Sequence, residues 1–215
     1  MESHWTDTVK AFLSPFPLSV GTGQIDFMFP TQKPIRDILD MTALMMCRNP
    51  YFDLLGLYSW VGKELLEPLF AQWGNAEEAK NATTQMIRGL WLCEIYRSLF
   101  EKKDGFASQF LSQGLSMFGI MIFRVATIAD GSFITSDNPV VFQKMSITTE
   151  LCPNGIYFPL TPRFLLFLGK RSEGAINNVI FRTVRSDDVK RINRVILNGA
   201  KKAIISTDKH LGYIL

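Results

Sequence analysis

Four consecutive polar residues, Thr135, Ser136, Asp137 and Asn138, precede Pro139 in the stretch GSFITSDNPV. A carboxylate such as that of Asp137 can ligate a divalent metal ion or act as a general base, and the neighbouring hydroxyl and amide groups would orient a ligand. Because Pro139 holds the preceding residue extended and lacks a backbone donor, regular strand pairing is expected to stop here. The same residue types are common turn formers, so a plain polar turn between two strands is the alternative interpretation.

Two arginines could complete a polar site around Asp137. Arg48 ends an apolar helical segment, and Arg163 lies in a turn between two apolar runs. Either guanidinium group could pair with Asp137 at the mouth of a cleft between helices and sheet. The alternative is that Arg48 extends into solvent. A single carboxylate is too little for two-metal hydrolysis, and no spacing in the sequence identifies further acids. The chain has no cluster of Cys and His residues, which argues against a structural zinc site.

The elements that must position these residues indicate an α+β fold. We expect an N-terminal helical layer packed on a mainly antiparallel C-terminal sheet with a final amphipathic helix, because helical patterns come first and strand patterns afterwards. The expected parts are an irregular lead-in over 1–33, a helical part over 34–116, and the sheet with its helix over 117–215. With 215 residues, these parts are expected to share one core as a single domain.

Helical periodicity dominates the first half of the chain. Pro34 is suited to a first helical turn, the apolar residues after it recur at helical spacing, and Asn49-Pro50 ends the run. Further helices are predicted over 52–73, 75–103 and 106–115.

Strand patterns dominate the second half. A continuous apolar run from 117 predicts a strand, and after a turn at 129–132 we expect a returning strand at 133–135. Two apolar runs separated by Thr161-Pro162-Arg163 predict a β-hairpin. Two further strands are predicted, at 140–143 and at 178–184.

A last helix is expected to start with Ser186-Asp187-Asp188 as its cap. Its predicted inner face consists of Val189, Ile192, Ile196, Gly199, Ala200 and Ala203. Basic residues are expected to face outward, and residues 204–206 are expected to return to the sheet.

Charge is distributed unevenly along the chain. Residues 161–215 carry eleven Lys or Arg against four Asp or Glu, whereas the whole chain has a net charge of +3. This basic part could bind nucleic acid or another polyanion. The alternative is that it is the solvated face of one helix, because no aromatic residues interleave with the basic ones as stacking platforms.

Cysteine usage and hydropathy bear on location. Three scattered cysteines, at 47, 93 and 152, fit a reducing compartment better than a disulfide framework, so a cytoplasmic location is expected. No secretion signal is recognised, because acidic residues precede an apolar stretch that prolines interrupt. The longest uncharged run, 105–123, contains five Ser or Gln residues, so no membrane span is expected.

Three short segments stand out together: FITSDNP at Phe133–Pro139, PLTP at Pro159–Pro162, and a helix that ends in Arg48-Asn49-Pro50. They resemble an uncharacterised bacterial family catalogued as a domain of unknown function, number four-two-three-eight, whose members carry F-I-T-S-D-x-P, P-L-[ST]-P and Arg-x-Pro segments. The resemblance covers the chain from Pro34 onward, but a His-Tyr-x-Pro opening usual in that family is missing. It implies no reaction, and it implies that the residues from Thr135 to Asp137 do more than form a turn.

Two classes of function fit these residues. The first is a ligand- or partner-binding domain with a polar site at Thr135–Asn138, which would bind a protein partner or self-associate through its apolar helical half. The alternative is a metal-assisted nuclease or phosphoester hydrolase, for example in phage defence, with a divalent metal ion on Asp137. The sequence contains no Gly-rich phosphate loop, no G-x-S-x-G segment and no Cys-His arrangement that would favour a particular enzyme class.

Overall fold

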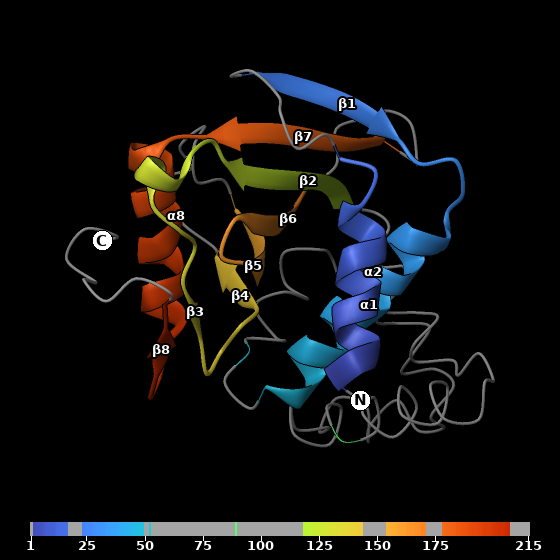
Figure 1. Cartoon of the computed structure of the whole chain (residues 1–215). Helices are drawn as coiled ribbons and strands as arrows, with labels where there is room; N and C mark the ends of the chain where they lie inside the picture. Colours follow the sequence, from blue (N-terminus) through green and yellow to red (C-terminus); the bar gives the residue numbers. More distant parts are fainter. Residues whose placement is uncertain are drawn as a thin grey trace.

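A mixed six-stranded β-sheet forms the centre of the protein in the computed structural model (Figure 1). The structure describes residues 2–16, 23–49, 52, 89, 118–143, 154–170 and 178–206. In their order across the sheet, the strands are β1 (Gln24–Met28), β7 (Asn178–Val184), β2 (Phe118–Val125), β6 (Phe164–Lys170), β5 (Gly155–Thr161) and β4 (Val141–Gln143). The helices predicted over 52–115 lie almost entirely outside the described residues.

Neighbouring strands of this sheet are antiparallel, with the exception of β2 and β7, which run parallel. β5 and β6 form the predicted hairpin, in which Ile156 lies opposite Leu168. The strands predicted from 117, at 140–143 and at 178–184 are also confirmed, as β2, β4 and β7. The prediction of a mainly antiparallel sheet is therefore confirmed. The parallel pairing of β2 with β7 was not predicted.

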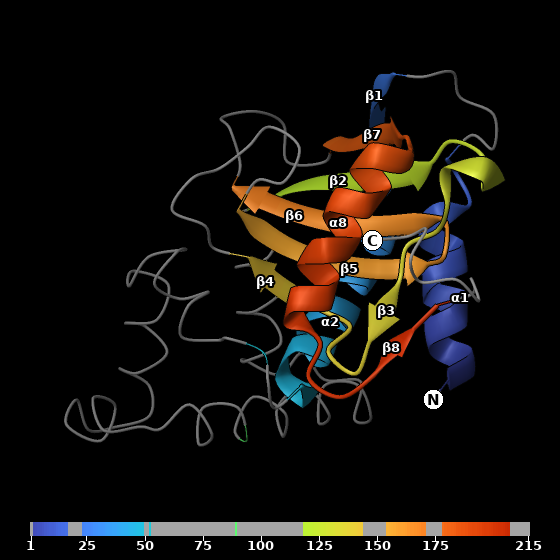
Figure 2. The same ribbon diagram turned by 90° about the vertical axis from the view of Figure 1, so that its left-hand side faces the viewer.

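Helices cover both faces of the sheet (Figure 2). α1 (Glu2–Leu13) and α2 (Lys33–Arg48) pack on one face, and α8 (Ser186–Gly199) packs on the other. Side chains of β2 alternate between the two cores: Ile122 packs with α1 and α2, and Phe123 packs with α8. A strand buried on both faces needs a continuous apolar run, which is the pattern of its sequence. Among the described residues, no helix has both the length and the apolar character to cross a membrane.

α2 begins and ends where the sequence predicts. Pro34 lies in its first turn, where the absent backbone donor would have had no partner within the helix. The backbone N–H of Asn49 donates to the carbonyl oxygen of Met45 at 3.2 Å and closes the last turn. Ile38 and Met46 on its apolar stripe are fully buried in the core that α2 shares with the sheet.

The first 33 residues, expected to be an irregular lead-in, contain α1 and β1. Phenylalanines in or next to these elements pack on distant partners. Phe12 of α1 stacks on Phe29, the residue after β1, with ring centroids 5.3 Å apart, and Phe16, which follows α1, stacks on Phe181 of β7 at 5.1 Å. Each aromatic pair contributes about 0.5–1.5 kcal/mol beyond the area that it buries. Because Phe181 lies far along the chain from Phe16, the sequence of the first 33 residues does not by itself indicate the elements that this contact stabilises.

A separate two-stranded ribbon replaces the predicted returning strand. β3 (Thr135–Ser136) pairs with β8 (Ile204–Ile205), and neither belongs to the six-stranded sheet. A 3-10 turn, η2 (Ile128–Asp130), follows β2 and leads the chain past α8 (Figure 1). The expectations that 133–135 returns along β2 and that 204–206 rejoins the main sheet are therefore wrong, because these short segments pair with each other.

α8 is shorter than its apolar stripe suggests. Val189, Ile192 and Ile196 are buried as predicted, but the helix ends at Gly199. A side chain at Gly199 would come within 2.6 Å of the Val141 side chain, so β4 and the last turn of α8 pack closely there. Residues 200–203, which were expected to extend the inner face, instead form a connection to β8.

Gly155→Ala tests how closely the sheet is packed. An added Cβ at Gly155 would lie 2.5 Å from the carbonyl oxygen of Leu168 and 2.6 Å from the Phe167 ring. We expect this overpacking to lower the free energy of unfolding by about 1–3 kcal/mol in urea denaturation. Gly23→Ala, where the added Cβ has no atom within 4 Å, should leave stability nearly unchanged. Equal stability of the two variants would contradict the packing.

Candidate functional site

The polar residues singled out in the sequence belong to a segment that runs alongside α8 from its first turn to its last. We call residues 130–138 the clamp segment. Apart from the two residues of β3, this segment has no ladder of strand hydrogen bonds among the described residues. Buried backbone groups need partners, and here side chains supply several of them.

Asp130 fixes the first end of the clamp segment. One of its carboxylate oxygens accepts the backbone N–H of Ser186 at 3.2 Å, and the other accepts the backbone N–H and the hydroxyl of Thr127 at 3.0 and 2.7 Å. The hydrogen bond from the Thr127 hydroxyl, and then the one from Ser186, lower the pKa of this carboxyl group. The predicted cap at Ser186-Asp187-Asp188 is therefore supplied instead by Asp130, at the positive end of the helix dipole.

Asn193 fixes the middle of the clamp segment from within α8. Its side chain is completely buried. Its Oδ1 accepts the backbone N–H of Ile134 at 3.1 Å, and its Nδ2 donates to the carbonyl oxygen of Ser132 at 2.9 Å. The side-chain amide of Asn193 thus satisfies one backbone N–H and one backbone carbonyl of the clamp segment, at two positions where the segment has no strand partner.

Ser136 and Asn138 fix the far end. Asn138 Nδ2 donates to the carbonyl oxygen of Gly199 at 2.9 Å, and its Oδ1 accepts a hydrogen bond from Asn49 Nδ2. The Ser136 hydroxyl accepts the backbone N–H of Asn138 at 3.1 Å and donates to its carbonyl oxygen at 2.9 Å. All three side chains are buried. The ends of α2 and α8 therefore meet at Asn138.

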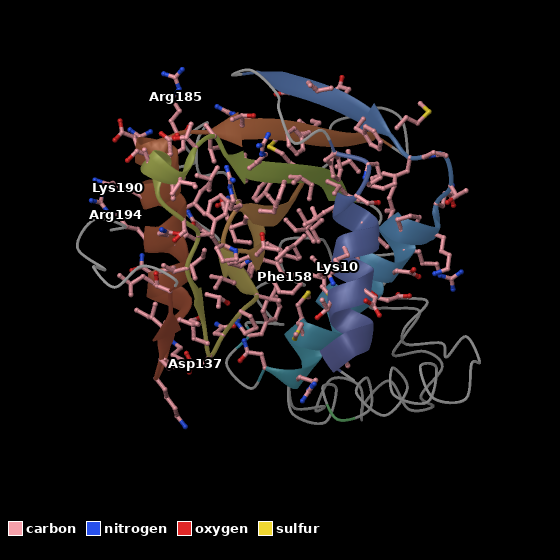
Figure 3. The ribbon with its side chains drawn as sticks, viewed as in Figure 1. Lys10, Asp137, Phe158, Arg185, Lys190 and Arg194 are labelled. Atoms are coloured by element: carbon pink, nitrogen blue, oxygen red, sulfur yellow. The ribbon has the colours of Figure 1, made fainter. Side chains whose placement is uncertain are left out.

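Asp137 holds the connection that follows α8. Its carboxylate accepts the backbone N–H groups of Lys201, Lys202 and Ala203 at 3.1, 3.0 and 3.4 Å. Its own N–H donates to the carbonyl oxygen of Ala203 at 3.1 Å. The Lys201 amide is the largest cause of the lowered pKa of Asp137, followed among the stabilising groups by those of Lys202 and Ala203. Figure 3 shows Asp137 near the far end of β3, beside β8.

The remaining predicted site residues lie in other surroundings. Arg48 is exposed at the last residue of α2. Arg163 lies in the β5–β6 turn, where its Nη2 donates to the Val125 carbonyl oxygen at 3.4 Å. Thr135 pairs with Ile205 through the backbone. Among the described residues, the hydrogen bonds to the Asp137 carboxylate come from amides, and none comes from Arg48 or Arg163.

The PLTP segment contacts the clamp segment directly. The carbonyl oxygen of Pro162 accepts the backbone N–H of Phe133 at 2.8 Å. The hydroxyl of Thr161 accepts the N–H groups of Arg163 and Phe164 at 3.2 and 3.1 Å, which shapes the turn. With the Asn49–Asn138 contact, the three segments noted in the sequence are therefore joined to one another in the structure.

The model of a family described as Protein of unknown function (DUF4238) matches residues 29–210. The chain belongs to this family. The matched range includes α2, the clamp segment and α8, and it leaves α1 and β1 outside. Neither a curated protein nor a solved structure matches the chain. The DUF4238 match thus supports the resemblance seen in the sequence and brings no reaction with it.

The polar side chains of the clamp segment are engaged with other parts of the chain. Ser136, Asp137 and Asn138 use their polar atoms on other parts of the chain. Metal ligation by Asp137 would have to compete with three amide hydrogen bonds. In the part of the chain that the structure describes, no three His, Cys, Asp or Glu side chains gather where a metal ion could bind.

Sequence reasoning missed Asp130, Asn193 and Asn49. A signal was available for Asn193, which lies four residues after Val189 and directly after Ile192, inside the apolar stripe of α8. An amide at such a position must find hydrogen-bond partners when the stripe is buried. No comparable local signal marks Asn49, because its partner lies 89 residues away.

Asn193→Ala tests the middle contact of the clamp. It removes both hydrogen bonds to the Ser132 carbonyl and the Ile134 N–H, and we expect a loss of about 2–4 kcal/mol in the free energy of unfolding, because buried backbone groups lose their partner. Asn198→Ala is the matched control, since Asn198 is exposed on the same helix. The assignment fails if both variants unfold at the same urea concentration.

Asp137→Asn tests the contact at the end of α8. The folded-state pKa of Asp137 is lowered below the ordinary value of 3.8, so its contribution to stability is present above that pH and is lost as the pH falls through the folded-state pKa. We expect the variant to be less stable than the wild type at neutral pH, and the difference to shrink below about pH 4. Asp26→Asn, at an exposed carboxylate on β1, serves as the control. A pH-independent difference would contradict the amide contacts.

Proposed function

We propose that the protein is a binding domain that holds a polyanionic partner on the solvent side of α8. The surface concerned, here called the basic face, consists of Lys190, Arg191, Arg194, Lys201 and Lys202. Arg191, Arg194, Lys201 and Lys202 are exposed, and Lys190 is half-buried. Lys190 and Arg194 project away from the sheet in Figure 3.

The charge along this stretch supports the proposal. Residues 190–202 contain five Lys or Arg and no Asp or Glu. The acidic residues of α8, Asp187 and Asp188, lie in its first turn, where they complement the helix dipole. The helical part from Lys190 to Gly199 extends over about 15 Å at 1.5 Å per residue, which is enough to contact several phosphate groups of one strand.

The clamp segment supports the same proposal through pre-organisation. Asp137 binds the amides of Lys201 and Lys202, so the backbone that carries these two exposed lysines is fixed before a partner arrives. Asn138 and Asn193 fix the helix that carries the arginines. A binding surface that is already ordered loses less conformational entropy on association. The polar segment thus serves binding by positioning the basic face, and the ligand need not touch it.

The chemistry of the basic face favours the phosphate backbone of a nucleic acid as its partner. Guanidinium and ammonium groups bind phosphate oxygens without regard to base sequence. No aromatic residue interrupts residues 190–202, so stacking on bases has no support there. We place this function in a bacterial cytoplasm, for which the scattered cysteines and the family resemblance are the support.

The alternative functions gain less support. A metal-assisted hydrolase based on Asp137 would need further ligands, and none gathers near this carboxylate among the described residues. A protein partner or a second copy on the helical half would bind mainly through residues 52–116, which lie almost entirely outside the described residues. Both stay predictions from the sequence.

The salt dependence of duplex binding tests the proposal. Log Kd of a labelled DNA duplex, measured by fluorescence anisotropy at several salt concentrations, should change linearly with log salt, because counterions are released. Arg191→Gln/Arg194→Gln should weaken binding and reduce the slope by about 2, since each phosphate contact contributes about 0.9.

Lys10→Gln/Arg36→Gln is the matched control. It removes the same number of positive charges from exposed positions of α1 and α2, on the other side of the sheet. We expect this variant to keep the wild-type slope. A wild-type protein that does not bind the duplex, or two double variants with equal slopes, would overturn the proposal.

A further inference from the structure

β1 forms one edge of the six-stranded sheet, next to β7. Figures 1 and 2 show it at the upper margin of the sheet, with no labelled element beyond it. Edge strands are commonly protected from pairing with other chains by lysine, by proline, by a β-bulge or by being very short. β4, at the opposite edge, has only three residues. β1 has five residues, no Lys or Pro and an unbroken register with β7, so its edge lacks these protections.

The backbone of β1 carries hydrogen-bonding groups that are directed away from β7. The N–H of Thr183 donates to the carbonyl oxygen of Gly23 at 3.3 Å, which makes these two residues a hydrogen-bonded pair of the antiparallel ladder. Because such pairs alternate, every second residue after Gly23 also directs its backbone groups toward β7. The intervening residues direct theirs outward and are exposed, namely Gln24, Asp26 and Met28. Among the described residues, no strand pairs with β1 on this side.

Side chains of β1 alternate between the two faces of the sheet. Ile25 lies opposite Phe181, which is buried in the core between the sheet and α1 and α2, but Ile25 itself is 40% exposed. Gln24 and Asp26 point to the other face, the side of α8, where Gln24 lies opposite Arg182. The open edge therefore presents an apolar side chain between two polar ones.

This strand is complementary to itself in one register. An antiparallel pair of β1 strands centred on Asp26 would set two carboxylates against each other, which is destabilising. A pair centred on Phe27 would set the carboxylate of Asp26 against the apolar side chain of Met28. A pair centred on Ile25 instead places Gln24 opposite Asp26 of the second copy, where the side-chain amide can donate to the carboxylate.

We propose that β1 pairs with β1 of a second copy of the chain in this register, so that two six-stranded sheets join edge to edge. Gln24 and Asp26 exchange backbone hydrogen bonds across the interface, because both direct these groups outward. The two Ile25 side chains form the closer, non-hydrogen-bonded pair and extend the apolar row that begins with Phe181. Since each copy contributes the same surface, the contact closes as a dimer.

The two-fold axis of this dimer is perpendicular to the joined sheet, because residues opposite each other point to the same face. Both copies therefore present α8 and its basic face on the same side. The consequence for binding rests on the proposed function: two basic faces on one side would contact one duplex together and strengthen binding through avidity. The dimer itself does not depend on nucleic acid.

The oligomeric state in the absence of nucleic acid tests the dimer. In sedimentation equilibrium, the mean mass of the wild type should rise with protein concentration from that of one chain to that of two. Ile25→Lys sets like charges against each other at the axis and should weaken dimerisation by about tenfold or more. Ile128→Lys is the matched control, because Ile128 is 86% exposed in η2, outside the sheet. It should dimerise as the wild type does.

Ile25→Cys tests the register, and it decides the matter if Ile25→Lys does not fold. The Cα atoms of a non-hydrogen-bonded pair lie about 4.5 Å apart, within the range that a disulfide spans. Mild oxidation should link Ile25→Cys into a covalent dimer, with Ile128→Cys as the control for other linkages.

Three results would each overturn the proposed dimer. The wild type stays monomeric up to submillimolar concentration, Ile25→Lys dimerises as tightly as the wild type, or Ile25→Cys links no more than Ile128→Cys. A protein that dimerises in this way but does not bind the duplex refutes only the proposed function.

Discussion

The side-chain hydrogen bonds between the clamp segment and α8 are the interaction on which the arrangement of the C-terminal half depends. Residues 130–138 leave β2 and pass the length of α8 with only two residues in a strand. Their backbone groups would be unsatisfied against an apolar helix, and Asn193 supplies partners for two of them from within α8. Asp130 of the segment in turn accepts the first backbone N–H of α8. Each such bond contributes modestly, but breaking it exposes a buried group without a partner, which is the larger effect. These hydrogen bonds therefore fix the position of α8 along the clamp segment.

The sequence predicted correctly those elements that are determined by residues close together in the chain. α2 was predicted by Pro34, helical spacing and Asn49-Pro50, and the β5–β6 hairpin by two apolar runs around Thr161-Pro162-Arg163. α1 and β1 were not predicted, and strands were expected near β3 and β8 but not as partners of each other, because these elements are stabilised by partners distant in sequence. A two-residue strand such as β3 has no periodicity to detect, and only its partner defines it. The parallel pairing of β2 with β7 was not predicted either, because a continuous apolar run does not indicate whether the neighbouring strand is parallel or antiparallel.

The sequence drew attention to the polar segment, but it did not indicate the contacts that the segment makes. Asp137 before Asn138-Pro139 suggested a carboxylate directed into a cleft. In the structure the carboxylate binds amides 64 to 66 residues further along the chain, which no spacing in the sequence could indicate. Strict requirements on residue type arise here from the geometry of these contacts: Asp137 accepts three donors, and Asn138 donates to one helix end while it accepts from another.

Hydrogen bonding within the chain also bears on which side chains can meet a partner. Around Asp137, the side chains of the motif are engaged within the chain, so the motif contributes stability and orientation. The binding that we propose falls instead to the exposed lysines and arginines that it positions. The motif can therefore be constrained in residue type without contacting a ligand, because its side chains must satisfy particular backbone groups elsewhere in the chain.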